Sequence, residues 1–191
     1  MNFEDFSSFK DALRKHSPDE LARNFLCNED VASMSSSDDY SNYLLQVKAD
    51  YEFSEKISIM GSGNWRFSLN PTKNFKRFDG DSDIDLVIIC KHTFHTIWDE
   101  LRIYHRRNYY SIGAADRERL RRHGEDVYSG FISPMWIPDR KSKTRYEYEV
   151  NANKYSNSSV GFRKVNMRFF KSIEETIDYY VRSIRLAKRG L

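Results

Sequence analysis

The sequence predicts an α+β fold in which a small mixed β-sheet is flanked by helices. Helices are indicated by apolar residues that recur every three or four positions, and strands by short apolar or alternating segments at 57–60, 83–90 and 162–170. With 191 residues, 39% apolar and 15% aromatic, the chain is long enough for one globular domain with a sizeable core. We expect an N-terminal helical segment, residues 1–56, packed on a core formed by residues 57–191.

Three helices are predicted in the N-terminal segment. Ser17 followed by Pro18 is typical of an N-cap with proline at the first helical position, and the polar cluster 35–39 contains candidate caps for the third helix. The apolar stripes of the first and third helices are Phe3, Phe6, Phe9 and Leu13, and Tyr40, Tyr43, Leu44, Val47 and Tyr51.

The core is predicted to begin with the strand 57–60, which ends at a glycine–serine–glycine turn. Residues 64–80 are expected to form an ordered loop or a short helix. The strand 83–90 follows, and Thr93 is expected to cap a helix with an apolar face.

The last third of the chain is predicted to contain a basic helix around 117–122 and an extended or looped segment at 130–138. Residues 146–150 alternate like a strand, but they also suit the end of a helix that starts near Lys143. The strand 162–170 places Asn166 and Arg168 on one face, and a final helix begins at a Ser172 cap, with Glu175 in the position of a capping box.

Charge is distributed unevenly along the chain. The net charge is only +3, but residues 1–56 hold 12 acidic and 6 basic side chains, which leaves 16 acidic and 25 basic side chains in the remainder. A basic core of this kind suggests that the core meets a polyanion, although ordinary surface charge explains any single residue as well.

The cysteine content and the hydrophobicity pattern bear on the cellular location that we expect. The chain has two cysteines, Cys27 and Cys90, so no disulfide framework is predicted. A basic and then apolar leader is absent, and no apolar run approaches the 18 or so residues that a membrane span needs. We therefore expect a cytoplasmic protein without a membrane function.

The most informative feature is a cluster of aspartates that runs into the apolar strand 83–90. Because successive strand residues point to opposite faces, Asp83 and Asp85 project from the same face, about 7 Å apart. Two adjacent carboxylates raise each other's pKa and are costly to bury, and a divalent cation resolves both problems. The pair is therefore a candidate site for Mg²⁺, or for Mn²⁺.

Gly61 and Ser62 after one strand, followed by Asp83 and Asp85 at the next, resemble the motif pair of the DNA polymerase β-like nucleotidyltransferase superfamily. The resemblance covers residues 57–90 well. It implies a palm-like mixed sheet and transfer of a nucleoside monophosphate from an NTP to a hydroxyl group of an RNA, a protein or a second nucleotide.

The resemblance also assigns roles to residues. Asp83 and Asp85 are implied as catalytic metal ligands, and Gly61, Ser62 and Gly63 as the turn that binds the nucleotide phosphates. A glycine there lets backbone N–H groups approach the phosphate oxygens. Compact members of this kind occur in toxin–antitoxin and anti-phage systems, and the short chain implies that a partner protein or a homo-oligomer completes the cleft.

The sequence departs from the superfamily pattern in two ways. Ser62 and Asp83 are 21 positions apart, which is an unusually long interval. Many active members place a third carboxylate on a later strand, where this chain has Asn166. Glu147 or Glu149 is then the candidate for a third metal ligand.

Basic residues are candidates for contacts with the acceptor or with phosphates. The residues in this group are Arg66, Lys73, Arg117 and Arg121, together with Asn166. Two alternatives stay open at this point: a nucleotide-sensing or partner-binding module that has lost turnover, and a basic RNA-binding protein whose acidic cluster is structural.

Overall fold

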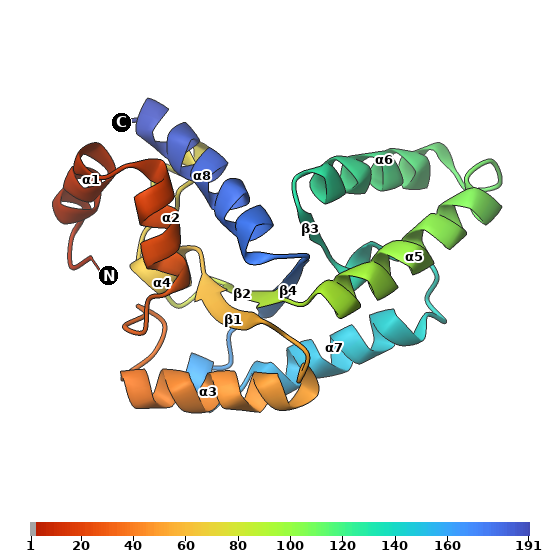
Figure 1. Ribbon diagram of the computed structural model, residues 1–191, viewed down its shortest axis with the longest axis horizontal. Coiled ribbons are helices and arrows are strands. Elements are labelled where there is room, and N and C mark those ends of the chain that lie inside the picture. The colour runs from red at the N-terminus through yellow and green to blue at the C-terminus, as the bar shows by residue number, and fades with distance from the viewer. Residues whose placement is uncertain (1–2) are drawn as a thin grey trace.

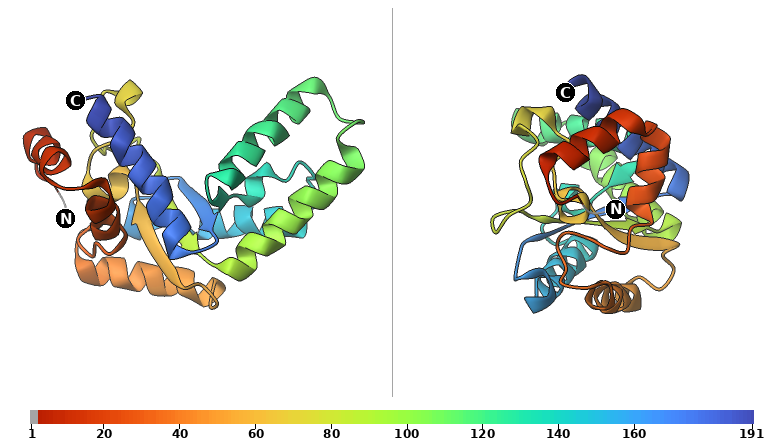
Figure 2. Two further views of the ribbon diagram at one scale, coloured as in Figure 1. Left: turned by 45° about the horizontal axis from the view of Figure 1, so that its top comes forward. Right: turned by 90° about the vertical axis from the view of Figure 1, so that its left-hand side faces the viewer.

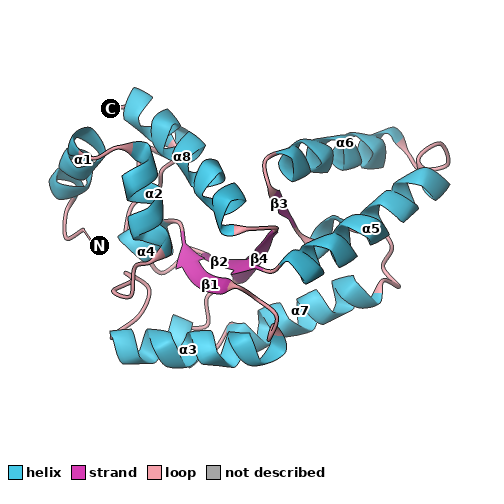
Figure 3. Cartoon of the chain, viewed as in Figure 1, coloured by secondary structure: helices cyan, strands magenta, loops and turns pink. Residues whose placement is uncertain are grey.

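A computed structural model describes residues 3–191 of the chain, and the fold is α+β as predicted. Its sheet has four strands in the order β1 (Lys56–Met60), β2 (Ile84–Ile89), β4 (Val165–Phe170) and β3 (Phe131–Ile132). Only the central pair, β2 and β4, is parallel, and each outer strand is antiparallel to its neighbour. The sheet is thus mixed and small (Figure 3).

Eight helices surround this sheet in the described part of the chain (Figure 1). They are α1 (Phe6–Lys15), α2 (Pro18–Leu26), α3 (Ser37–Asp50), α4 (Ser62–Trp65), α5 (Lys91–Asn108), α6 (Ala114–Tyr128), α7 (Lys143–Tyr155) and α8 (Ile173–Arg189). None of the helices within residues 3–191 is both long enough and apolar enough to cross a membrane.

The predicted helix starts are confirmed where a serine accepts a backbone hydrogen bond. Ser17 accepts from the N–H of Glu20 at 3.1 Å, and Ser172 accepts from the N–H of Glu175 at 3.3 Å. Ser36, from the predicted polar cluster, caps α3 in the same way. These side chains replace the partners that the first N–H groups of a helix lack.

Two predicted boundaries are wrong. Helix α5 starts at Lys91 with Cys90 as its N-cap, so Thr93 lies inside the helix, where its hydroxyl donates to Cys90 Sγ at 3.2 Å. Strand β4 starts at Val165 because Gly161 and Phe162 adopt positive φ angles of 62° and 55°, which turn the chain. Both errors arise because a turn or cap position depends on backbone angles more than on residue type.

Four segments with open or coarse expectations are now defined. Residues 146–150 belong to helix α7, and the basic helix around 117–122 extends over Ala114–Tyr128 as α6. The long interval after β1 contains the short helix α4 and a 3₁₀ turn at Pro71–Lys73, and 130–138 contains β3 and a second 3₁₀ turn, Pro134–Trp136.

The core has two parts, one on each face of the sheet. Helices α1, α2 and α8 cover one face and α3, α5 and α7 the other, and the further views in Figure 2 agree with this layering. The sheet side chains on the α3 side are Ile57, Ile59, Ile84, Leu86, Ile88, Ile132, Val165, Met167 and Phe169, and those on the α8 side are Met60, Val87, Ile89, Phe131 and Phe170.

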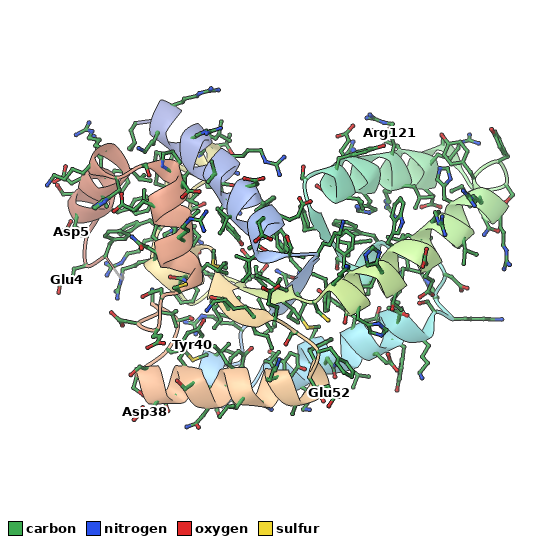
Figure 4. All side chains as sticks on the ribbon, viewed as in Figure 1. Glu4, Asp5, Asp38, Tyr40, Glu52 and Arg121 are labelled. Carbon is green, nitrogen blue, oxygen red and sulfur yellow. The ribbon has the colours of Figure 1, made fainter. Side chains whose placement is uncertain are left out.

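A tyrosine fixes α3 against the sheet. Tyr40 points from α3 toward β1, where its hydroxyl accepts from the N–H of Ile59 at 3.0 Å and lies 3.2 Å from the Ser58 hydroxyl (Figure 4). Burial raises the pKa of this phenol and outweighs the two hydrogen bonds, which favour the charged form, so Tyr40 stays neutral.

Candidate functional site

The two predicted metal ligands lie at the N-terminal end of β2. Asp85 is the second residue of the strand, where it pairs with Met60 of β1 and with Asn166 of β4. Asp83 precedes the strand by one residue and is exposed. Strand alternation therefore turns Asp85 toward the α8 side of the sheet, and its charge lies where the apolar cover of that face is incomplete.

Gly61, the turn after β1, lies directly against Asp85. Its φ angle is 69°, and a Cβ atom at this position would lie 2.8 Å from Asp85 Oδ2. Both the backbone angle and the lack of space therefore require glycine here. The two halves of the predicted motif, 24 positions apart in sequence, are in contact.

The turn is held in place by a buried side chain that the sequence does not single out. The Asn64 amide, fully buried in α4, donates to the carbonyl oxygens of Phe25 at 2.8 Å and Ile59 at 2.7 Å. Its own oxygen accepts from the Asn28 amide at 2.7 Å. A buried amide with partners on three segments fixes the backbone of the turn.

Ser62 and Gly63 form the first residues of α4, directly after the turn. The backbone carbonyl of Ser62 accepts from the N–H of Arg66 at 2.9 Å, and Gly63 is buried against Ile59. Of the three residues of the predicted phosphate turn, Gly61 thus lies against Asp85, and Ser62 and Gly63 follow it as the first turn of α4.

Asn166 occupies the place on β4 beside the aspartates. Its amide nitrogen donates to Asp83 Oδ2 at 3.0 Å, and its Cα is in register with that of Asp85. The predicted face of β4 is confirmed, since Asn166, Arg168 and Phe170 alternate with buried apolar residues. A neutral amide therefore stands where the superfamily pattern has a third acid.

Arg168 is the site residue that sequence reasoning did not identify. Its Nη2 lies 3.4 Å from Asp85 Oδ1, its Nη1 donates to the Tyr179 hydroxyl at 3.0 Å, and its guanidinium lies 5.4 Å from the Phe131 ring centroid. Burial is the largest single influence and opposes the charged form, but Asp85 acts together with Tyr180 and Tyr179, and their combined effect raises the pKa of Arg168. The sequence signal that could have identified it is its position two residues after Asn166, which places both side chains on the same face of β4.

The two glutamates expected to supply a third metal ligand do not join the aspartates. Both lie on α7, where Glu147 pairs with Lys143 at 3.5 Å and Glu149 with Arg145 at 3.1 Å. Among residues 3–191, no three His, Cys, Asp or Glu side chains are grouped so that they can hold a metal ion. The reason is that 146–150 is helical, so these side chains leave from α7 and not from the sheet.

Two carboxylates nevertheless suit one hard cation. Mg²⁺ commonly binds one or two protein carboxylates and takes its other oxygen ligands from water and substrate phosphates. Asp83 and Asp85 offer such oxygen donors, although each has a protein partner in the structure: the Asn166 amide nitrogen donates to Asp83, and Arg168 pairs with Asp85. The residues present therefore fit Mg²⁺ as ligands shared with a nucleotide.

A cavity of about 320 Å³ opens beside this group. Gly61, Asp85 and Arg168 line it together with Lys73, which is one of the predicted phosphate contacts. Tyr179 and Tyr180 of α8 also line it. The cavity thus combines a carboxylate, two cationic side chains and aromatic rings.

The other predicted basic contacts are placed differently. Arg66 ends α4 in a left-handed conformation, with a φ angle of 83°. Arg117 and Arg121 lie on α6 and do not line this cavity. Arg121, at the top of Figure 4, pairs with Glu118 at 2.9 Å and Glu125 at 2.8 Å, and its hydrogen bonds help to lower the pKa of Glu118 to about 2.

Comparisons of this chain with protein-family models, with curated proteins and with solved structures found no match. What the site can do is therefore inferred from its own geometry: a glycine turn in contact with one of two carboxylates, and an arginine paired with that carboxylate. This combination is suited to binding a polyanion through a cation and basic side chains.

Proposed function

We propose that this protein is a Mg²⁺-dependent nucleotidyltransferase of the DNA polymerase β-like type. It transfers a nucleoside monophosphate from an NTP to a hydroxyl group of an acceptor. The observation that carries the proposal is the contact between Gly61 and Asp85, because it joins the turn suited to phosphates and the carboxylates suited to Mg²⁺ in one site.

Each group has a part in the transfer. The acceptor oxygen forms a bond to the α-phosphorus, the bond from that phosphorus to the bridging oxygen breaks, pyrophosphate leaves and the hydroxyl proton is released. Asp83 and Asp85 would hold Mg²⁺, and the chemistry that this ion would supply is neutralisation of charge on the phosphates. Gly61 lets the backbone approach the triphosphate, and Lys73 adds positive charge.

The acceptor enters from the other side of Arg168. A second cavity, of about 840 Å³, is lined by Asn166 and Arg168 on β4 and by Tyr148 on α7. Arg168 borders both cavities, so a nucleotide in one and an acceptor in the other meet beside Asp85. A partner protein or a second copy of the chain then encloses the acceptor, which is an RNA, a protein or a nucleotide.

The test is incubation with NTPs labelled on the α-phosphate, with Mg²⁺, across RNA, protein and nucleotide acceptors. We expect label transfer with release of pyrophosphate. Asp83→Ala and Asp85→Ala should each lower the rate at least a hundredfold, since the charge stabilisation provided by a metal is worth several kcal/mol.

Asp81→Ala is the matched control, because Asp81 is an exposed member of the same aspartate cluster that makes no contact with Gly61 or Arg168. It should transfer label at the wild-type rate. Equal activity of all three variants, or no transfer to any acceptor, contradicts the proposal.

A nucleotide-binding module without turnover is the second candidate. It is favoured by Asn166 in place of an acid and by the Arg168 guanidinium, which neutralises Asp85 without a metal. Calorimetry with an NTP separates the two candidates. Binding that needs Asp85 but releases no pyrophosphate supports the module, and release of pyrophosphate excludes it.

A further inference from the structure

A cavity outside the aspartate site gathers arginines. It has a volume of about 310 Å³ and lies where α6, the start of α7 and the 3₁₀ turn Pro134–Trp136 meet. Its charged and aromatic lining includes Asp116, Arg119, His123, Trp136, Arg140 and Arg145.

The charges in this cavity are unbalanced. Three guanidinium groups and one carboxylate line the cavity: Asp116 lies 3.5 Å from Arg119, and Glu149, which is outside the lining, pairs with Arg145. Arg140 makes no hydrogen bond or ion pair with any other residue in 3–191. Burial lowers the pKa of His123, so this side chain adds no charge near neutral pH. The cavity therefore carries excess positive charge.

One arginine is already held in position. Arg145 donates from Nη1 to the Ile137 carbonyl at 3.0 Å and from Nε to Glu149 at 3.1 Å, and its side chain is only 23% exposed. These bonds leave Nη2 without a partner in the described structure. A fixed guanidinium loses little conformational entropy when it binds an oxyanion.

Two stacked aromatic rings line part of the cavity. The rings of His123 and Trp136 stack at 4.4 Å with an interplanar angle of 8°. Trp136 also borders the 840 Å³ cavity that contains Asn166 and Arg168, as does Met135. The two cavities thus adjoin through one turn, and Trp136 forms part of the wall of each.

We propose that this cavity is a binding site for a phosphate group. Guanidinium groups match phosphate oxygens in geometry and charge, and a partly enclosed site strengthens such contacts. The phosphate belongs either to a free anion such as pyrophosphate or to a nucleotide strand. In the second case, the rest of the strand would lie in the neighbouring 840 Å³ cavity, which Arg168 lines. The site does not depend on the transfer reaction proposed above.

Trp136 provides the readout. The test is to titrate the 191-residue chain at fixed ionic strength with inorganic pyrophosphate and, separately, with a short single-stranded oligonucleotide, and to follow tryptophan fluorescence. Arg140→Gln and Arg119→Gln should each weaken binding about tenfold or more, the loss expected when a hydrogen bond to a charged group is removed. Trp136→Phe should remove the signal but leave binding detectable by calorimetry.

Arg122→Gln is the matched control, because Arg122 lies on the same helix, is 71% exposed and does not line the cavity. Both Arg119 and Arg140 are exposed, so their replacement is not expected to unfold the protein. Asp83→Ala should bind both anions normally, which separates this site from the transfer reaction.

Tighter binding of pyrophosphate than of the oligonucleotide supports a free anion as ligand, and the reverse supports a strand. If neither anion binds, or if Arg140→Gln and Arg119→Gln bind both as the control does, the proposal is wrong.

Discussion

The two faces of the sheet differ in what they bury. On the α3 side, every sheet residue of the core is apolar, from Ile57 to Phe169. On the α8 side, apolar residues cover one end, whereas Asp85, Asn166 and Arg168 occupy the other. The apolar face contributes mainly to stability. The polar end of the other face makes the protein less stable than apolar packing at the same place would, and such a loss of stability is typical of a functional site.

The contribution of the apolar face to stability can be tested by removing one buried aromatic ring. Phe169→Ala should lower the free energy of unfolding by about 3–5 kcal/mol, because Phe169 is fully buried and its loss leaves a cavity. Denaturant unfolding measures the effect. Leu45→Ala, on the exposed side of α3, should change stability by less than about 0.5 kcal/mol. Similar losses in the two variants would contradict the assignment of the core.

The polar end is tested by removing its arginine. Arg168→Gln leaves the Asp85 carboxylate without its cation, and we expect a loss of about 1–3 kcal/mol, less than for a fully buried pair because both side chains are 30% exposed. A double-mutant cycle with Asp85→Asn measures the coupling. If the two losses are additive, the ion pair contributes nothing.

Gly61 tests the contact between the turn and the carboxylate. Gly61→Ala should cost about 1–2 kcal/mol, since alanine is strained at a φ angle of 69° and its Cβ would collide with Asp85 Oδ2. Thermal unfolding gives the measurement. Gly80→Ala is the matched control, because a Cβ there meets nothing within 4 Å, and it should unfold at the wild-type temperature.

Asn166 allows the polar end to be made more acidic. Asn166→Asp places a third carboxylate beside Asp83, so the pKa of the introduced group is raised in the folded state. The variant should be about 1 kcal/mol less stable than wild type at pH 7, with the deficit shrinking as the pH falls toward 4. Added Mg²⁺ should restore stability at pH 7. If the stability of Asn166→Asp relative to wild type changes neither with pH nor with added Mg²⁺, a cation site here is excluded.

The elements nearest the motifs could be predicted from the sequence. Strand 57–60, the glycine turn and the strand that follows Asp83 are local features, set by alternation, apolar runs and the backbone freedom of glycine. Serine caps at Ser17 and Ser172 were predictable for the same reason. The two boundary errors, at Thr93 and Phe162, lie where backbone angles decide and several residue types are tolerated.

The sequence by itself thus determined the strand that carries Asp85 and the glycine turn that precedes it, whereas Asp83, expected in the same strand, lies one residue before its start. Only the tertiary structure decided that Gly61 touches Asp85, that Arg168 pairs with Asp85 across 83 positions, and that Glu147 and Glu149 leave from a helix. The physical reason is that alternation acts between neighbours in the chain, whereas the register of β2 with β4 depends on how both strands bury their apolar faces against helices distant in sequence.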